Sequence, residues 1–244
     1  MPVGLEIRPE LQKDNRTFQR HWYVWLLLAL SGSIAAAQAP PAPAPPAARF
    51  VVVLDAAHGG DDPGGRLADG QPEKAFTLAL SVRLRSLLAA RGIPVVTTRE
   101  SDETVELDRR ATIANRANAQ ACLSLHGSES GSGIHLFVSS LAPAQPTRFA
   151  AWKTAQAASV VRSLALAGTL NSTLLQAGMN VTLGRTSLLA VDSMICPAVA
   201  IEIAPERGPD KKATAELDDP EYQARVAEAL AAALLAWRSE GRQP

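Results

Sequence analysis

The sequence predicts an α/β fold: a single domain with a largely parallel central sheet flanked by helices on both faces. Short apolar runs rich in β-branched residues alternate along the chain with longer segments of helical periodicity. This strand-helix order implies right-handed crossovers and parallel neighbours. Polar residues also stand where several of the runs end, and open α/β sheets keep their functional sites at the carboxyl ends of strands.

Residues 1–38 have the pattern of a secretory signal peptide. A basic segment precedes an apolar run from Trp22 to Ile34, and small residues follow the run. This order predicts export of the protein with cleavage near Ala37 or Ala39. An uncleaved membrane anchor is the alternative because the basic segment is unusually long, although the run is shorter than the roughly 20 residues of a spanning helix.

The amino-acid composition changes between a short linker and the region expected to fold. Residues 39–48 are nearly all proline and alanine, which favours an extended spacer, and the domain is expected over residues 49–240. The formal net charge is zero, with 24 basic and 24 acidic residues, so a nucleic-acid partner is not expected. The glycine-rich loop 60–70 lacks the ending of a nucleotide P-loop, and phosphate binding is not expected either.

The first predicted strand follows the linker and leads directly to a histidine. Residues 50–54 are apolar and mostly β-branched, and Asp55, His58 and two glycines come after them. Glycine lets the backbone turn sharply and approach a ligand closely. The segment therefore predicts a buried strand that presents His58 at its carboxyl end, with an ordinary turn and an incidental histidine as the alternative.

A helix, a second strand and a second helix are predicted next. Apolar residues recur at helical spacing over 73–90, and Gly92 is the expected residue just past the helix end. Glu73 then lies in the first helical turn, where a glutamate more often matches the helix dipole at the surface than binds a metal. Residues 93–98 are predicted to form the second strand and 108–118 the second helix.

Two further strands each carry a histidine. The apolar run 121–126 ends at His126, in the same position relative to its strand as His58. Residues 133–138 alternate as a strand that carries His135. We interpret His135 as a strand histidine without a role in metal binding, because its neighbours match no ligand motif.

The last third of the chain ends with a strand and a long helix. Residues 147–176 predict one long or two shorter helices, and 180–194 are ambiguous between strand and loop. The last predicted strand is 199–203. It carries Glu202 between two isoleucines, so an exposed strand residue is the alternative to a functional one. Asp219 and Pro220 form a helix start, and the terminal helix is expected to pack on the sheet.

The chain contains two cysteines, Cys122 and Cys196, in or beside apolar strands. In an exported protein they could pair, but buried free thiols are also common. Two cysteines do not make a disulfide framework, so both states remain open.

Four residues at element edges have the side chains of a catalytic metal site. His58, Glu73 and His126 supply two imidazoles and one carboxylate, and Glu202 supplies a further carboxylate. Two histidines and a carboxylate are the ligands of a catalytic zinc site that keeps one position open for water. The remaining carboxylate would then be free to act as a base.

These residues lie in motifs that resemble those of zinc-dependent N-acetylmuramoyl-L-alanine amidases, amidase family 3. Order and spacing agree over about residues 50–238. The matching segments are Leu54-Asp55-Ala56-Ala57-His58-Gly59-Gly60-Asp61-Asp62-Pro63-Gly64, Gly70-Gln71-Pro72-Glu73-Lys74, Thr98-Arg99, Leu107-Asp108-Arg109-Arg110 leading to Ala114-Asn115, Ser124-Leu125-His126 and Pro197-Ala198-Val199-Ala200-Ile201-Glu202.

The resemblance implies a cell-wall hydrolase. It implies that His58, Glu73 and His126 hold Zn²⁺, that Glu202 is the catalytic base, and that residues 49–240 are the catalytic domain. The implied reaction is hydrolysis of the amide between N-acetylmuramic acid and L-alanine in peptidoglycan. The implied location is periplasmic or extracellular, with an activator protein as a possible partner and membrane contact only through an uncleaved leader.

The chain departs from the family pattern at three places. Gly127-Ser128 follow His126 where the family commonly has Ala-Asn, and Ala57 stands where it usually has glycine. After Glu202 the family has a small residue, phenylalanine and a polar turn, whereas this chain continues with residues 203–208. Glu206 in that segment is a second candidate for the base.

Two other classes of function remain as alternatives. One is a wall-binding module that keeps the amidase fold without turnover, suggested by the altered segment after Glu202. The other is a serine hydrolase that uses Ser124 or Ser128 with His126, and the missing Gly-x-Ser-x-Gly motif disfavours it.

Overall fold

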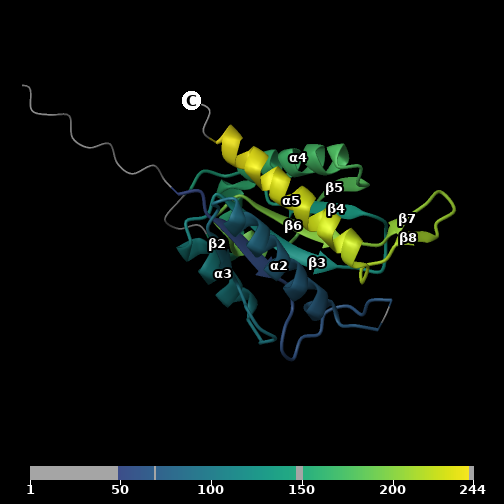
Figure 1. Ribbon diagram of the computed structural model, residues 1–244. Helices are drawn as coiled ribbons and strands as arrows, with labels where there is room; N and C mark the ends of the chain where they lie inside the picture. The colour runs from purple at the N-terminus through teal and green to yellow at the C-terminus, as the bar shows by residue number, and fades with distance from the viewer. Residues whose placement is uncertain (1–48, 69, 147–150, 242–244) are drawn as a thin grey trace, which may run out of the picture. The chain divides into compact units, whose positions relative to one another are not determined.

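A six-stranded sheet forms the centre of the structure, a computed structural model that describes residues 49–68, 70–146 and 151–241 (Figure 1). All neighbouring strands are parallel except β4 and β6, so the predicted largely parallel sheet is confirmed. In sheet order the strands are β2 Val95–Thr97, β1 Val52–Ala56, β3 Ala121–Gly127, β6 Ala198–Ile203, β4 Ile134–Ser139 and β5 Val181–Thr186.

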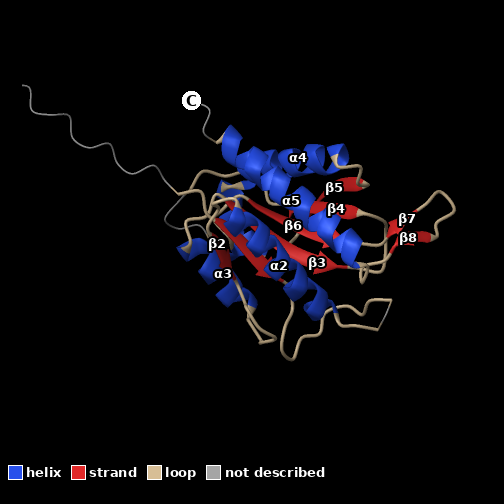
Figure 2. Ribbon diagram, viewed as in Figure 1, coloured by secondary structure: helices blue, strands red, loops and turns tan. Residues whose placement is uncertain are grey.

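Helices cover both faces of this sheet, as predicted. Successive strand residues point to opposite faces. On one face, Leu54 of β1 packs in a core with α2 Glu73–Ala90, α4 Val160–Gln176 and α5 Pro220–Glu240. On the other face, Val53 packs in a second core with α3 Leu107–Arg116 and the short helix η2 Val191–Ser193. In the view of Figure 2, α2 and α5 lie in front of the strands.

Several predicted elements differ from the observed ones in extent. Of the predicted helical region 147–176, residues 147–150 lie outside the described residues, and the rest forms η1 Trp152–Ala158 and α4. The ambiguous region 180–194 contains the edge strand β5 and the helix η2. The predictions for the leader 1–38 and the linker 39–48 also lie outside the described residues. No helix in the described part of the chain combines the length and hydropathy that a membrane crossing requires.

The prediction that residues 199–203 form the last strand was wrong. Two further strands, β7 Glu206–Arg207 and β8 Ala213–Ala215, form a separate antiparallel pair, which projects at the right of Figure 1. The turn between them is closed by the Gly208 amide, which donates to the Lys212 carbonyl at 2.9 Å. Strands this short are not visible in a periodicity argument, which needs several alternating residues.

The terminal helix α5 begins as predicted and is tied to the end of β6. The Asp219 side chain accepts a hydrogen bond from the Glu221 amide at 2.8 Å, and Pro220 is the first helical residue. Tyr222 is buried in the core, and its hydroxyl donates to the Ala204 carbonyl at 2.7 Å. The helix therefore holds the backbone immediately after the strand that carries Glu202.

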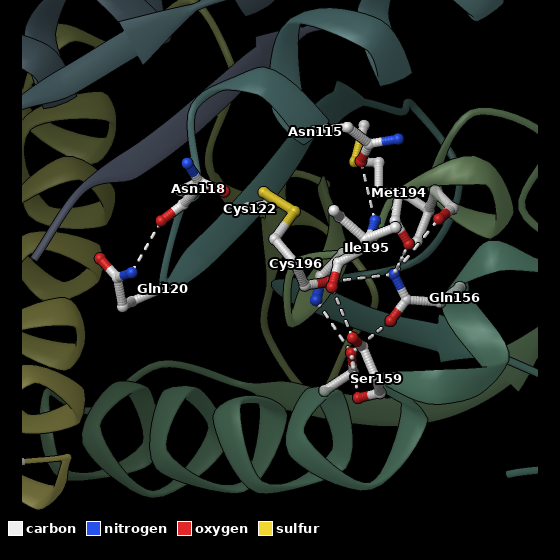
Figure 3. Close-up of a disulfide and its surroundings, with 12 residues drawn as sticks. Asn115, Asn118, Gln120, Cys122, Gln156, Ser159, Met194, Ile195 and Cys196 are labelled. Atoms are coloured by element: carbon white, nitrogen blue, oxygen red, sulfur yellow. Dashed lines mark hydrogen bonds between the residues drawn. A yellow bond between two sulfur atoms is a disulfide. The ribbon is translucent and has the colours of Figure 1, made fainter. Parts of the chain in front are cut away.

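Cys122 and Cys196 form a disulfide, which the sequence left open (Figure 3). Their Cα atoms are 6.1 Å apart, and their sequence separation is 74. The Gln156 side chain from η1 donates to the carbonyls of Met194 and Cys196 at 2.9 and 3.1 Å, so hydrogen bonds support the same segment. The disulfide joins β3 to the residues that lead into β6, its neighbour in the sheet.

Candidate metal centre

His58 lies two residues beyond β1 in an unusual backbone conformation. Its φ is +63°, in the left-handed region that side chains other than glycine rarely adopt. The next turn requires glycine at Gly60, because a Cβ there would lie 2.1 Å from the Thr104 hydroxyl. The Gly60 amide instead donates to Asp102 at 2.8 Å. The loop thus packs closely on residues 102–104 and directs His58 across the carboxyl edge of the sheet.

Glu73 is the first residue of α2 and is buried, with 6% of its surface exposed. Its two oxygens accept hydrogen bonds from the amides of Gly65 at 2.8 Å and Gly127 at 3.1 Å. The same oxygens lie 3.1 Å from His58 Nε2 and 3.0 Å from His126 Nδ1. The carboxylate is therefore held rigidly between the two histidines.

The three side chains form one compact donor cluster. A ligand atom of each of His58, Glu73 and His126 lies within 4.8 Å of the other two. The imidazole rings meet edge to face, with centroids 5.5 Å apart. Two imidazole nitrogens and one carboxylate oxygen at this spacing fit a single divalent ion, and the set matches the protein ligands of catalytic zinc sites. The sequence-predicted ligands are thus brought together from three separate elements.

Charge is concentrated in the cluster. Burial alone would raise the pKa of Glu73. The hydrogen bonds from both histidines and from the two backbone amides outweigh burial, and they hold the pKa of Glu73 far below its usual value. The hydrogen bond with Glu73 in turn raises the pKa of His58. An anionic carboxylate between two basic nitrogens attracts a cation.

Asp62 orients His58 and was not singled out in the sequence. Its Oδ2 lies 2.8 Å from His58 Nδ1, which leaves Nε2 directed at Glu73. Carboxylates that hold the outer nitrogen of a ligating histidine fix its tautomer and ring orientation. In the sequence, Asp62 lay within the first matching segment without a role of its own, and its four-residue spacing from His58 was the available signal.

Glu202 lies beside the cluster, on the neighbouring strand. It is in parallel register with His126, so both side chains emerge on the same face of the sheet. Glu202 is half-buried, and among the described residues its carboxylate has no hydrogen-bond or ion-pair partner. Glu206 differs, because Arg225 Nη2 donates to its carboxylate at 2.7 Å. The geometry favours Glu202 over Glu206 as a free base.

His135 and the two candidate serines make hydrogen bonds elsewhere, and Ser128 Oγ lies 2.8 Å from the Ser130 hydroxyl. His135 lies opposite Glu202 in the antiparallel pair of β4 and β6, and its Nδ1 is 2.6 Å from the Thr182 hydroxyl. Ser124 is buried, and its hydroxyl donates to Asp55 at 2.8 Å. A serine whose proton is committed to a buried carboxylate is poorly placed to be activated by His126.

The cluster opens into two adjoining hollows. One, of about 180 Å³, is lined by the His58 loop, Arg110 and residues 104–107. The other, of about 310 Å³, is walled by Leu107 and residues 187–191. Both include Ser124 and His126 in their linings. The donor cluster is therefore open to solvent on this side.

One departure from the family pattern has a steric reason. A Cβ at Gly127 would lie 2.8 Å from the Phe76 ring of α2, closer than a real Cβ contact. Phe76 itself is buried in the main core. The small residue after His126 thus lets α2 pack against β3 while Glu73 reaches the histidines.

Fold and cluster together define the class: α/β proteins with two histidines and one carboxylate that could hold a metal ion at the carboxyl edge of the sheet. Within that class, the chain belongs to the Amidase_3 family, N-acetylmuramoyl-L-alanine amidase, which matches residues 52–236. The resemblance noted in the sequence is confirmed.

Individual relatives agree with this family. The chain is 34% identical over 90 residues to the sporulation-specific N-acetylmuramoyl-L-alanine amidase of Bacillus subtilis, and 40% identical over 76 residues to AmiA of Escherichia coli. These matches cover 36% and 31% of this chain, and it spans only 35% and 26% of the relatives. The catalytic domain of CwlV from Bacillus (Paenibacillus) polymyxa var. colistinus is 26% identical with a TM-score of 0.60, over 78% of this chain and 98% of that one.

Proposed function

We propose that this domain hydrolyses the amide bond between N-acetylmuramic acid and L-alanine in peptidoglycan, with Zn²⁺ held by His58, Glu73 and His126. The observation that carries the proposal is the cluster of three ligand atoms within 4.8 Å in a chain of the Amidase_3 family. These three residues would hold the ion, whose chemistry when bound would be to polarise the scissile carbonyl and activate a water molecule.

The three ligands are prepared for this task by their surroundings. His58 presents Nε2 because its Nδ1 is bonded to Asp62. His126 presents Nδ1, which lies on the side of Glu73. The backbone amides that donate to Glu73 favour its anionic form and hold it between the two histidines.

Glu202 is proposed as the general base and acid. Its carboxylate would take a proton from the attacking water and return it to the nitrogen of L-alanine as the C–N bond breaks. The water oxygen then remains on the lactyl carbonyl carbon, and the products are a carboxylic acid and a free amine. The unpaired, half-buried carboxylate in register with His126 supports this role.

The substrate lies in the cell wall, and a location outside the cytoplasm is part of the proposal. Disulfides persist mainly in oxidising compartments, so the pair Cys122–Cys196 is consistent with export. We propose the periplasm or the extracellular space, with residues 1–38 as the signal peptide that directs the chain there.

The decisive experiment combines metal analysis with a release assay. Zinc-loaded protein is incubated with purified peptidoglycan, and new L-alanine amino termini are counted. We expect about one zinc per chain and release that stops on chelation and returns with zinc. Binding to the wall without release at any zinc concentration would favour the non-catalytic module instead. Release that survives full chelation would favour the serine hydrolase.

A further inference from the structure

A buried carboxylate that the proposed reaction does not use lies under the metal centre. Asp55, near the end of β1, is 2% exposed. Its Oδ1 accepts hydrogen bonds from the Thr98 hydroxyl at 2.7 Å and from Arg110 Nη1 at 2.8 Å. Arg110 is itself 4% exposed, so the two opposite charges are buried together. Burial of two charged groups has a desolvation free energy cost. The position of this ion pair beside both histidines suggests that it has a role in holding them.

Ser124 connects Asp55 to His126. The two residues are in register on β1 and β3, and the Ser124 hydroxyl donates to Asp55 Oδ2 at 2.8 Å. A hydroxyl has one proton, so towards His126 the Ser124 oxygen can only accept. His126 Nε2 lies 3.4 Å from that oxygen, a long hydrogen bond. With a metal ion bound at Nδ1 in place of the hydrogen bond to Glu73, the ring proton of His126 would lie on Nε2 and point at the Ser124 oxygen.

Arg110 connects Asp55 to His58. Besides its bond to Asp55, the guanidinium donates to the carbonyls of Ala56 and His58, each at 2.7 Å. Its Nε donates to the Val105 carbonyl at 2.8 Å. The planar fork of arginine therefore holds the backbone of His58 in its left-handed conformation while it neutralises the carboxylate that supports His126.

We propose that Arg110, Asp55 and Ser124 form a positioning relay that sets both histidines for one metal ion. Arg110 donates a hydrogen bond to the backbone carbonyl of His58. Ser124 is held by its hydrogen bond to Asp55 and in turn fixes the position of His126 Nε2. The inference rests on the proposed function only in taking His58 and His126 as ligands. None of the three relay residues is itself among the proposed ligands.

The test uses two buried hydroxyls that donate to the same carboxylate. Ser124→Ala removes the link between Asp55 and His126, whereas Thr98→Val removes a comparable hydrogen bond to Asp55 that leads to no ligand. Arg110 and Asp55 are left unchanged, because an unpaired buried charge would endanger folding. Ser124→Thr restores the hydroxyl, and the hollows beside Ser124 leave room for the added methyl.

The readout is zinc affinity, measured on the full chain by competition with a chromophoric chelator, beside the visible spectrum of the Co²⁺-substituted protein. For Ser124→Ala we expect zinc binding about 10- to 100-fold weaker and altered Co²⁺ bands. Thr98→Val should stay within about threefold of wild type, and Ser124→Thr should recover most of the affinity. Melting temperatures of the metal-free proteins show whether each variant is folded.

Two results would overturn the relay. The first is wild-type zinc affinity in Ser124→Ala, and the second is an equal loss in Ser124→Ala and Thr98→Val, which would mark a general packing effect. Neither result bears on the amidase assay. Conversely, a wild-type protein that binds zinc through His58 and His126 but releases no amino termini would refute the proposed function and leave the relay standing.

Discussion

Glu202 on β6 lies directly beside His126 on β3, because the two residues are in parallel register in the central sheet. The disulfide Cys122–Cys196 joins the start of β3 to the residues just before β6. The proposed base on one strand and the proposed ligand on its neighbour are therefore held side by side by the sheet. Such preorganisation matters, because a group that transfers a proton must stay within hydrogen-bond reach of the reacting atoms.

The first prediction concerns this base. Glu202→Gln keeps the size of the side chain but cannot accept a proton, so amide hydrolysis should fall by at least about 100-fold while zinc content stays near one per chain. The measurement is the rate of new amino termini released from purified cell wall, beside zinc analysis of the same preparation.

Glu206→Gln is the matched control. It makes the same chemical change four residues away, in a carboxylate already paired with Arg225, and it should retain most of the activity. If Glu202→Gln keeps normal turnover and Glu206→Gln loses it, the base is Glu206 and the assignment to Glu202 is wrong.

The second prediction concerns the ligands. His58→Ala or His126→Ala removes one of three protein donors, so each purified variant should lose its zinc on dialysis against a mild chelator that leaves wild type loaded. Glu73→Gln should weaken zinc binding as well. His135→Ala is the control, since His135 is another strand histidine whose Nδ1 contacts Thr182. Zinc retained in both His58→Ala and His126→Ala would contradict this ligand set.

The third prediction concerns the disulfide. It closes a long loop, with a sequence separation of 74 between its ends, so the double variant Cys122→Ala/Cys196→Ala should lose about 2–4 kcal/mol of unfolding free energy. Urea titrations of the oxidised wild type and the double variant measure the difference. We expect the same loss on reduction of the wild type, and no loss in the double variant under reducing conditions. An unchanged urea midpoint in the double variant would show that the disulfide contributes nothing.

The fourth prediction concerns Tyr222. Tyr222→Phe leaves the buried Ala204 carbonyl without its donor, at a cost of about 1–3 kcal/mol in unfolding free energy. Burial also raises the pKa of the Tyr222 hydroxyl above its usual value. The folded state then holds this proton more tightly than the unfolded state, so this contribution is fully present at neutral pH and is lost as the pH rises above about 10.

The pH dependence separates Tyr222 from other groups. Denaturation curves of wild type and Tyr222→Phe are compared at neutral pH and at about pH 11, above the usual tyrosine pKa of about 10. The difference in stability between the two proteins should shrink at the higher pH. A difference that is constant across this range would show that the hydroxyl does not titrate with unfolding.

The fifth prediction concerns the leader, which lies outside the described residues. The mature protein should begin near Gln38 or Pro40, because the small residues before these positions form the expected cleavage site. Amino-terminal sequencing of exported protein checks this. Recovery of peptides from residues 1–30 in that material would favour the uncleaved anchor.

The sequence by itself determined the elements that carry the site. Apolar runs marked β1, β3 and β6, and helical spacing marked α2 and α5, because burial of a strand or a helix face imposes a local pattern on the chain. The four proposed site residues stood at the edges of these elements. Their motifs were enough to show the resemblance to the amidase family before any contact was known.

Only the tertiary structure decided how these pieces pair. In the folded chain β4 lies antiparallel beside β6, Cys122 is bonded to Cys196, and Arg225 donates a hydrogen bond to Glu206. It also placed Arg110 and Asp55 together beneath the two histidines, although 55 positions separate them in the chain. Such contacts depend on the register and order of distant strands. Local periodicity reports which face of an element is buried, but it carries no information about the residue that lies against it.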